Sequence, residues 1–473
     1  MKTKKIFNFL LLLGFLSGCD YLDIVPDNLP TLEMAFNNKS SAERFLFTCY
    51  SFVPEHGKIG TDPGMDVGDE VWYYSDNSAD YSNKTTFWIA KGMQNSNEPL
   101  VDYWNGTQWG KAMFVGIRDC NVFIENIEKV PDLSAYDKET WKAEAKVLKA
   151  FYHFWMMRMY GPIPIIKENI PVSAGEDEVR VVRDKIDDIV TYIVSLIDES
   201  VEYLPLNIQN EAAEMGRITR PAAKAIKAKI LAFAASPFFN GNLDYANFKN
   251  AEGEPFFNQV YDNEKWTKAA DACLEAIQCA EEAGHGLYEF VNMSSTQLSD
   301  ETILSLSNRC KVTERWNKEL VWGCGQSGIR DLQVLCQPWL ESNYSSDDRY
   351  HNARNGTFAP TLAVAETFYT KNGVPMDEDK NYDYSKRYTT QVATEADKYY
   401  IQPGYTTAKL HFDREPRFYA TLGFDGSSWY GIGKMDDNDM WYLQAKAKQA
   451  SGKRGNTLYS ITGYFAKKLV RYQ

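Results

Sequence analysis

Apolar side chains recur every three or four residues through much of the chain between residues 98 and 293, and this spacing is the strongest constraint on its fold. On an α-helix such residues form one stripe, which has to be buried against a neighbouring element. The clearest stripe predicts a helix with Asp137 as its N-cap and a stop at Gly161 and Pro162, since glycine favours a left-handed helix end and proline cannot continue the helix. Its members are Trp141, Ala145, Leu148, Tyr152, Trp155 and Met159.

Further segments with the same period contain Trp109, Ile186, Pro221 and Trp266. The segment that starts with Pro221 is rich in alanine, and small side chains let neighbouring helices approach closely. A tryptophan followed by spaced alanines, as after Trp266, is similar to a tetratricopeptide helix, although the full repeat pattern is absent. The periodicity therefore predicts a mainly α fold with tetratricopeptide-like helix pairs. Four helical tryptophans are expected in its core: Trp109, Trp141, Trp155 and Trp266.

The amino-terminal stretch is typical of a lipoprotein. Three lysines precede an apolar run over residues 6–16, which is about half the roughly 20 residues that a membrane-spanning helix needs. The letters LSGC, ending at Cys19, fit the bacterial lipobox, in which the cysteine receives a lipid and the chain is cut before it. We therefore expect a signal peptide over residues 1–18, lipid attachment at Cys19 and a polar tether over residues 19–30. An ordinary signal with a chance cysteine is the alternative.

The net charge and the cysteine spacing exclude several classes of function and of structural site for the rest of the chain. The net charge of −13 argues against a nucleic-acid partner, because such partners need a basic surface. None of the cysteines forms a CxxC pair or has a zinc-like spacing to histidine. Cys49, Cys120 and Cys273 fall on apolar helix faces, where a free cysteine packs as a small hydrophobic residue, so we expect few or no disulfides.

Two regions lack the helical period and hold the surplus of aromatic residues. Residues 57–97 are rich in glycine, aspartate, asparagine and aromatic side chains, and residues 294–460 contain short strand-like pieces such as ELVWGC and RFYATLGF. Long ordered loops in a compact domain usually carry function. We therefore expect one domain over residues 31–473, in which these regions form a loop-rich, ligand-facing part with small β-elements. The helical scaffold is expected mainly over residues 31–56 and 98–293.

Four segments in order along the chain resemble the SusD/RagB family of Bacteroidetes nutrient-binding lipoproteins. They are CDYLDIVP after the lipobox, AEAKVLKAFYHFWMMRMYGPIPII, GRITRPAAKAIKAKILAFAASPFFNGN and FDREPRFYATLGFDGSSWYG. The resemblance implies an α-rich SusD-like fold whose lipid anchor holds it on the exterior side of the outer membrane. It also implies a SusC-like TonB-dependent transporter as partner, and capture of glycans or, in some members, of peptides.

The carboxyl-terminal end departs from the family pattern. Members usually continue past a segment similar to GYFAKKLV into a further helix, whereas this chain stops at RYQ. We therefore expect the chain to be truncated at its carboxyl terminus.

Glycan binding needs flat aromatic faces beside planar polar groups, because sugar rings present apolar C–H faces and hydroxyl edges. The two loop-rich regions supply both, and the alternative for each tryptophan is that it covers a loop core. Trp322 lies among apolar, strand-like neighbours and is expected to be core. The candidate ligand-binding residues are Trp72, Tyr73, Trp88, Trp316, Arg330, Trp339 and Tyr344, and we expect one surface to gather them.

Catalysis is the competing class of function. A glycosidase needs two carboxylates at a defined separation, which a sequence with 64 acidic residues cannot exclude. However, neither G-x-S-x-G nor H-E-x-x-H occurs, and His153 lies within a buried helix, where it is expected to be a hydrogen-bonded core residue. We therefore predict a binding protein without catalytic residues and without a cofactor. A purely structural cap on the transporter is the third alternative.

A calcium loop is the one metal site that the sequence suggests. Asp377, Asp379, Asn381 and Asp383 match ligand positions of an EF-hand, yet Tyr382 and Tyr388 replace the glycine and the glutamate that the loop requires. A solvated acidic loop without metal is therefore the prediction.

Overall fold

The computed structural model describes residues 32–60, 62–73, 85–293, 295–325, 329–342, 353–455 and 458–472. The helices are α2 (Leu32–Ala35), α3 (Lys39–Tyr50), α4 (Pro63–Asp66), α5 (Thr85–Ala90), α6 (Met113–Asn126), α7 (Ala135–Tyr160), α8 (Glu176–Val179), α9 (Ile186–Asp198), α10 (Glu211–Glu214), α11 (Arg220–Ala235), α12 (Glu264–Glu282), α13 (Asp300–Cys310), α14 (Ile329–Cys336), α15 (Leu362–Thr367) and α16 (Pro416–Thr421). The strands are β1 (Val71–Tyr73), β2 (Phe358–Pro360), β3 (Thr390–Val392), β4 (Thr406–Ala408), β5 (Leu422–Gly423), β6 (Ser428–Trp429), β7 (Trp441–Tyr442) and β8 (Phe465–Ala466).

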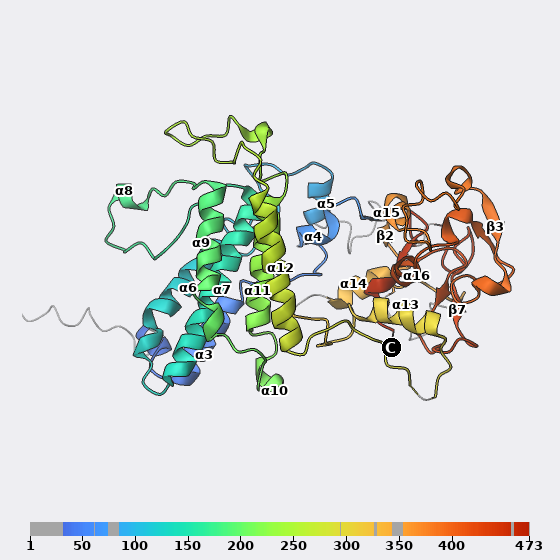
Figure 1. Ribbon diagram of the computed structural model, residues 1–473, viewed down its shortest axis with the longest axis horizontal. Helices are drawn as coiled ribbons and strands as arrows, with labels where there is room; N and C mark the ends of the chain where they lie inside the picture. The colour runs from blue at the N-terminus through green and yellow to red at the C-terminus, as the bar shows by residue number, and fades with distance from the viewer. Residues whose placement is uncertain are drawn as a thin grey trace, which may run out of the picture.

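The long helices form one half of the molecule and the short elements form the other (Figure 1). Helices α6, α7, α9, α11 and α12 lie side by side, and the closest pairs are α6 with α7, α7 with α9, and α11 with α12. Within the described residues, the strands join as antiparallel pairs, β1 with β2, β3 with β4, β5 with β8 and β6 with β7. The prediction of a mainly α fold with helix pairs and small β-elements is confirmed.

Helix α7 is the longest helix and has clear start and stop signals. The Ser134 hydroxyl accepts a hydrogen bond of 3.0 Å from the backbone N–H of Asp137, so Ser134 is the N-cap. The expectation that Asp137 is the cap is wrong by one turn, and its carboxylate instead lies in the first turn, where a negative charge is favourable. Gly161 ends the helix with φ of 69°, as predicted from the sequence.

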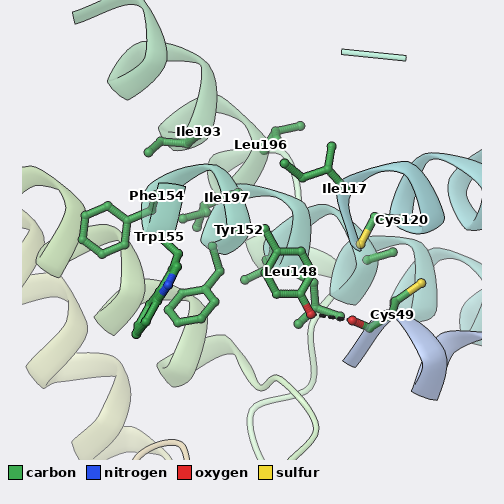
Figure 2. Close-up of a cluster of buried hydrophobic side chains, with 14 of the residues drawn as sticks. Cys49, Ile117, Cys120, Leu148, Tyr152, Phe154, Trp155, Ile193, Leu196 and Ile197 are labelled. Atoms are coloured by element: carbon green, nitrogen blue, oxygen red, sulfur yellow. Dashed lines mark hydrogen bonds between the residues drawn. The ribbon is translucent and has the colours of Figure 1, made fainter. Parts of the chain in front are cut away.

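Residues 147–157 of α7 are all buried, as their apolar composition predicts. Figure 2 shows residues of α3, α6 and α9 packed around this stretch, and α11 also contacts α7. Two of its polar side chains find partners within the core: the Tyr152 hydroxyl donates to the carbonyl of Cys49, and His153 Nδ1 donates to the carbonyl of Lys149 over 2.8 Å. His153 Nε2 also accepts from the backbone N–H of Ile166 over 3.2 Å, so His153 is the hydrogen-bonded core residue that was expected.

Two of the four helical tryptophans are not in the core. Trp141 and Trp155 are buried, but Trp109 is 72% exposed because it precedes the first turn of α6. Trp266 is exposed because α12 packs on α11 through another face, which carries the buried residues Ala269, Ala272 and Ala276. Cys273 shares the exposed face of α12 and is likewise not a core residue.

The loop-rich half is held together by buried cations that bind backbone carbonyls. Arg309 of α13 donates to the carbonyl of Tyr430 over 2.9 Å and to that of Val470 over 3.0 Å. Lys467 Nζ donates to the carbonyl of Tyr419 over 2.8 Å. These contacts join distant segments of this half, in which the described strands form two-stranded sheets. The segment ELVWGC forms no strand, and RFYATLGF divides into α16 and β5.

Burial of His153 makes the stability of the helical half depend on pH. Burial lowers the pKa of His153 to about 4, against about 6.5 in an unfolded chain. The unfolded chain therefore binds a proton that the native state excludes as the pH falls from about 6.5 towards 4, which removes about 1.4 kcal/mol of stability per pH unit. We expect His153→Gln to be less stable than the wild type at pH 7.5 and the difference to shrink at pH 5, measured by urea denaturation. His285→Gln serves as the control at a less buried position, and a difference for His153→Gln that is the same at both pH values would contradict this expectation.

Candidate functional site

The exposed aromatic surface of the loop-rich half lies where β1 and α5 meet. In β1 the side chains alternate, so that Val71 is buried and Trp72 is 39% exposed. The Trp72 ring lies edge-on to Phe87, with centroids 4.9 Å apart, and Phe87 is buried in the core beneath. Trp88, the next residue of α5, is 38% exposed. We call Trp72, Phe87 and Trp88 the aromatic ledge.

Helix α14 shares the core beneath the aromatic ledge. Leu332 of α14 packs in the same hydrophobic cluster as Phe87. Arg330, one of the candidate ligand residues, is exposed at the start of this helix, with a guanidinium nitrogen 3.8 Å from the Asp331 carboxylate. Arg330 can therefore reach a ligand from the surface.

Trp339 is a core residue, which corrects its assignment as a ligand contact. It is 4% exposed, and its indole N–H donates to the carbonyl of Ala353 over 3.1 Å. Its backbone N–H donates to the Asn355 side chain over 3.0 Å, and the Arg454 guanidinium lies 5.5 Å from the ring centroid. The ring is therefore not accessible to a sugar, because Ala353 and Arg454 lie against it.

Trp316 lies apart from the aromatic ledge. Its ring packs on Gly216 and Gly323, where a Cβ on Gly323 would approach it to 2.8 Å. It lines a pocket of about 380 Å³ next to α10, and Figure 1 shows α10 and α5 towards opposite ends of α11. The expected single surface is thus divided in two. Cys19, Tyr344 and the side chain of Tyr73 lie outside the described residues.

A larger pocket of about 650 Å³ lies between α3, α7, α11 and the segment 319–325. Trp322 and Phe151 form one wall, with their rings edge-on at 5.3 Å between centroids. The Trp322 indole N–H donates to the carbonyl of Gly216 over 3.0 Å. Trp322 was expected to be a core residue, but the structure shows it half-buried. Its side chain packs against the hydrophobic core and also lines the pocket. This pocket escapes sequence analysis because its lining comes from distant segments.

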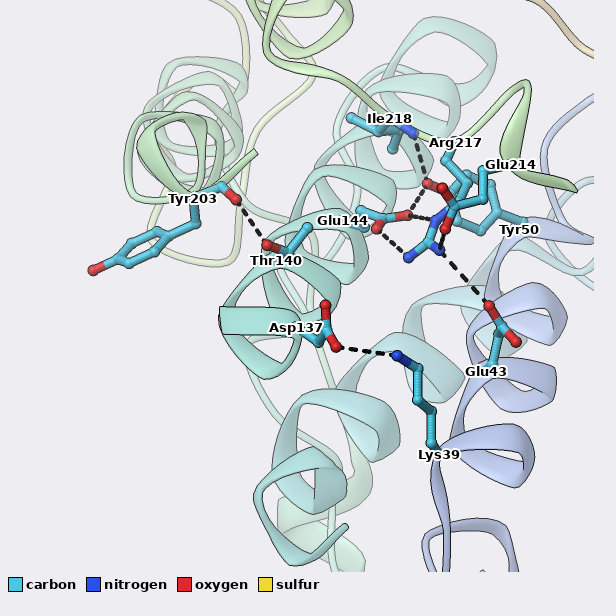
Figure 3. A network of polar contacts seen from close by, with 10 residues as sticks. All are labelled: Lys39, Glu43, Tyr50, Asp137, Thr140, Glu144, Tyr203, Glu214, Arg217 and Ile218. Atoms are coloured by element: carbon cyan, nitrogen blue, oxygen red, sulfur yellow. Dashed lines mark hydrogen bonds and ion pairs between the residues drawn. The ribbon is translucent and has the colours of Figure 1, made fainter. Parts of the chain in front are cut away.

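A buried ion network holds one wall of this pocket in place (Figure 3). Arg217 makes two bonds to the Glu144 carboxylate, of 2.6 and 3.1 Å, and one of 2.8 Å to Glu214. The Tyr50 hydroxyl donates to Glu144 over 2.5 Å and accepts from the backbone N–H of Ile218 over 2.8 Å. Burial and the negative charge of Glu144 raise the pKa of Tyr50, so it stays protonated as a donor. The network ties the segment 214–218 to α3 and α7.

The carboxylates of the pocket have partners, which argues against a role as general acids. Glu214 pairs with Arg217, and Glu319 pairs with Lys311 over 2.8 Å. Burial alone would raise the pKa of Glu319, but the bonds to Lys311 and to the backbone of Tyr288 lower it below the ordinary value. A glycosidase acid needs the opposite shift.

No group of three or more histidine, cysteine, aspartate or glutamate side chains that could hold a metal ion occurs in the part of the chain that the structure describes. In the EF-hand-like segment, Asp379 is buried instead of solvated. Its carboxylate accepts hydrogen bonds from Thr370, Asn372 and the backbone of Asn381, at 2.5, 3.0 and 2.8 Å. This carboxylate therefore stabilises its own turn.

Comparison with known proteins assigns the family. A family model described as "Starch-binding associating with outer membrane" matches residues 20–231, and a model of the SusD family matches residues 330–473. The chain belongs to the SusD/RagB family, as its motifs predict. Members of this family are outer-membrane-associated binding proteins and not enzymes. Across the described residues, none of the helices has the length and apolar character needed to cross a membrane.

Solved structures share the fold. BT4246 is 28% identical with a TM-score of 0.74, and the match covers 91% of this chain and 72% of BT4246. The SusD-like protein BF3747 from Bacteroides fragilis is 17% identical, with a TM-score of 0.61 and coverage of 93% and 70%. BF0978 from the same species, a SusD-like carbohydrate-binding protein, is 16% identical, with a TM-score of 0.52 and coverage of 91% and 67%. No curated protein matches the chain.

Removal of Arg217 should destabilise the protein strongly, because it leaves Glu144 buried without a counter-charge. We expect Arg217→Met to lower the free energy of unfolding by about 3–5 kcal/mol, and the double change Arg217→Met with Glu144→Met to recover much of that loss. Urea denaturation at pH 7.5 measures both. Lys142→Met breaks a more exposed pair with Glu128 and should cost no more than about 1 kcal/mol. Equal losses for Arg217→Met and Lys142→Met would show that the network is not a stabilising constraint.

Proposed function

We propose that this protein is a surface lipoprotein that captures oligosaccharides or polysaccharides and delivers them to a SusC-like TonB-dependent outer-membrane transporter. The observation that carries the proposal is the aromatic ledge, which presents two half-exposed indoles beside a buried phenylalanine. Family membership and the carbohydrate-binding relative BF0978 support the same class of ligand.

The aromatic ledge has the properties that sugar stacking requires. Phe87 limits the movement of Trp72 through its edge-on ring contact, so binding would cost little side-chain entropy. Each stacked aromatic ring contributes about 0.5–1.5 kcal/mol beyond the area that it buries. Tyr73 and Arg330 are proposed as polar neighbours of the stacked sugar, and Trp316 as a separate contact. Tyr344 is proposed as a further ligand contact. Trp339 is not proposed as a ligand contact, because its side chain is buried.

The lipid anchor places this binding surface at the membrane. Residues 1–18 are proposed to be removed, and acyl chains on Cys19 would hold the protein, since each buried CH₂ contributes about 0.8 kcal/mol. Residues 19–30 would then act as a tether to the single domain over residues 31–473.

Loss of Cys19 should release the protein from the membrane. We expect Cys19→Ala to abolish incorporation of a clickable fatty acid and to move the protein to the soluble fraction of cells. Wild-type protein that incorporates no label would disprove the anchor. Cys273→Ala is a suitable control, because this cysteine is exposed on α12.

Loss of either indole of the aromatic ledge should weaken glycan binding. We expect Trp72→Ala and Trp88→Ala each to reduce affinity for neutral oligosaccharides several-fold to about tenfold, where tenfold corresponds to about 1.4 kcal/mol. Calorimetry with a panel of oligosaccharides of rising length, on protein without residues 1–19, measures this, and added salt should change the affinity little because stacking involves no charge.

Trp109→Ala is the matched control, since this indole is exposed but lies outside the aromatic ledge. Unchanged affinity in both Trp72→Ala and Trp88→Ala would remove the aromatic ledge from the site. Binding of peptides in a salt-sensitive manner, without binding of any glycan, would favour an oligopeptide-binding function instead.

A further inference from the structure

Two positively charged side chains near the large pocket, Arg158 and Lys229, form no ion pair within the described residues. The guanidinium of Arg158, on α7, lies over the rings of Phe154, Trp155 and Phe233, at 5.6, 5.2 and 4.8 Å from their centroids. Within the described residues it makes no hydrogen bond and no ion pair, although a guanidinium carries five N–H donors. Arg158 is thus held in a fixed position by aromatic rings while its donors stay available.

Lys229 extends this positive charge towards the pocket. It lies one helical turn before Phe233 on α11, so it occupies the same helix face that Arg158 covers. Lys229 lines the large pocket, and in the described part of the chain it forms no ion pair. Partial burial and the charge of Arg158 lower the pKa of Lys229, whereas the negative charge of Asp62 acts in the opposite direction on both cations.

Asp62 is the acid whose charge acts on both cations, but within the described residues it forms an ion pair with neither. The Asp62 carboxylate is buried and accepts from His56, Gly57 and Gly64, at 3.2, 3.2 and 2.9 Å. The two acids that line the pocket, Glu214 and Glu319, have partners of their own, as described above. Among the described lining residues, Lys229 is therefore the charged group that forms no ion pair.

The apolar residues that line the large pocket can pack against the apolar face of a sugar ring. Phe151 and Trp322 form one wall, and Ile226 lies one turn before Lys229 on α11. The volume of about 650 Å³ falls in the range of roughly 300–1,000 Å³ that is typical of sites for small ligands. The pocket thus combines aromatic walls with a lysine that forms no ion pair within the described residues.

We propose that the large pocket binds an acidic sugar, with its carboxylate on Lys229 and its ring against Phe151 and Trp322. The inference rests on the proposed function, because it takes the ligand to be a glycan, and it adds that the glycan carries carboxylates. Arg158 acts as a positioning residue, which strengthens the positive potential behind Lys229. The overall charge of −13 repels a long polyanion, so a single acidic unit on a mostly neutral chain fits best.

The test compares sugar acids with their methyl esters, which keep the ring and remove the charge. Glucuronate, galacturonate and N-acetylneuraminate, each with its ester, are titrated into the protein without residues 1–19, with the quenching of tryptophan fluorescence and the thermal shift as readouts. We expect at least one acid to bind at least tenfold more tightly than its ester, and the difference to shrink with added salt. Absence of binding by all three acids, or equal binding of acids and esters, would overturn the proposal.

Substitutions in α11 and α7 test which residues cause the preference for the acid over its ester. Lys229→Ala should remove the preference for the acid, Lys229→Arg should keep most of it, and Arg158→Met should reduce it while leaving ester binding unchanged. Lys227→Ala is the matched control, because this neighbouring lysine pairs with Asp198 over 2.6 Å and does not line the pocket. A preference for the acid that survives Lys229→Ala would overturn the assignment.

Variants of the aromatic ledge distinguish a failure of this inference from a failure of the proposed function. If Trp88→Ala weakens binding of neutral oligosaccharides while Lys229→Ala leaves acid binding intact, the pocket assignment fails and glycan capture stands. If Lys229 controls acid binding but no oligosaccharide binds, the pocket assignment stands and glycan capture fails.

Discussion

Complete burial of the middle of α7 is the constraint on which the rest of the structure depends. A helix without an exposed face has to be covered on every side, and α3, α6, α9 and α11 supply that cover. Burial also favours hydrogen bonds for the polar groups of this stretch, since an unsatisfied polar group in a core is costly. Tyr152, His153 and Glu144 accordingly bind groups that belong to other segments, and these bonds fix where the segments run.

Binding surfaces occur where this cover is incomplete or where short elements extend beyond it. The large pocket opens beside α7, where Arg217 ties the segment 214–218 to Glu144 and the Gly216 carbonyl accepts a hydrogen bond from Trp322. The aromatic ledge lies in the other half, where β1 and α5 are too short to bury both faces of their own aromatic residues. The rigid helical layer thus positions two chemically different surfaces, one of exposed indoles and one that combines aromatic walls with a lysine.

Periodicity predicts the helices and the family motifs predict the fold, because both are local properties of the sequence. The face that a helix buries is set by its neighbours, which explains why Trp266 and Cys273 are exposed although their spacing is helical. Trp339 is buried by chain that follows α14, and its environment depends on contacts with Ala353 and Asn355 that no local pattern reveals. The pocket depends on four distant segments and was not predictable from any one of them.

The carbonyl contacts of the buried Arg309 carry a consequence for the order of folding. Arg309 binds Tyr430 and Val470, which follow it by 121 and 161 residues, whereas the long helices pair mostly with near neighbours in sequence. Contacts between distant residues form slowly, because closing a long loop costs entropy before any contact stabilises it. During synthesis the helical half can therefore assemble first, and the loop-rich half can close only after residue 470 has been added.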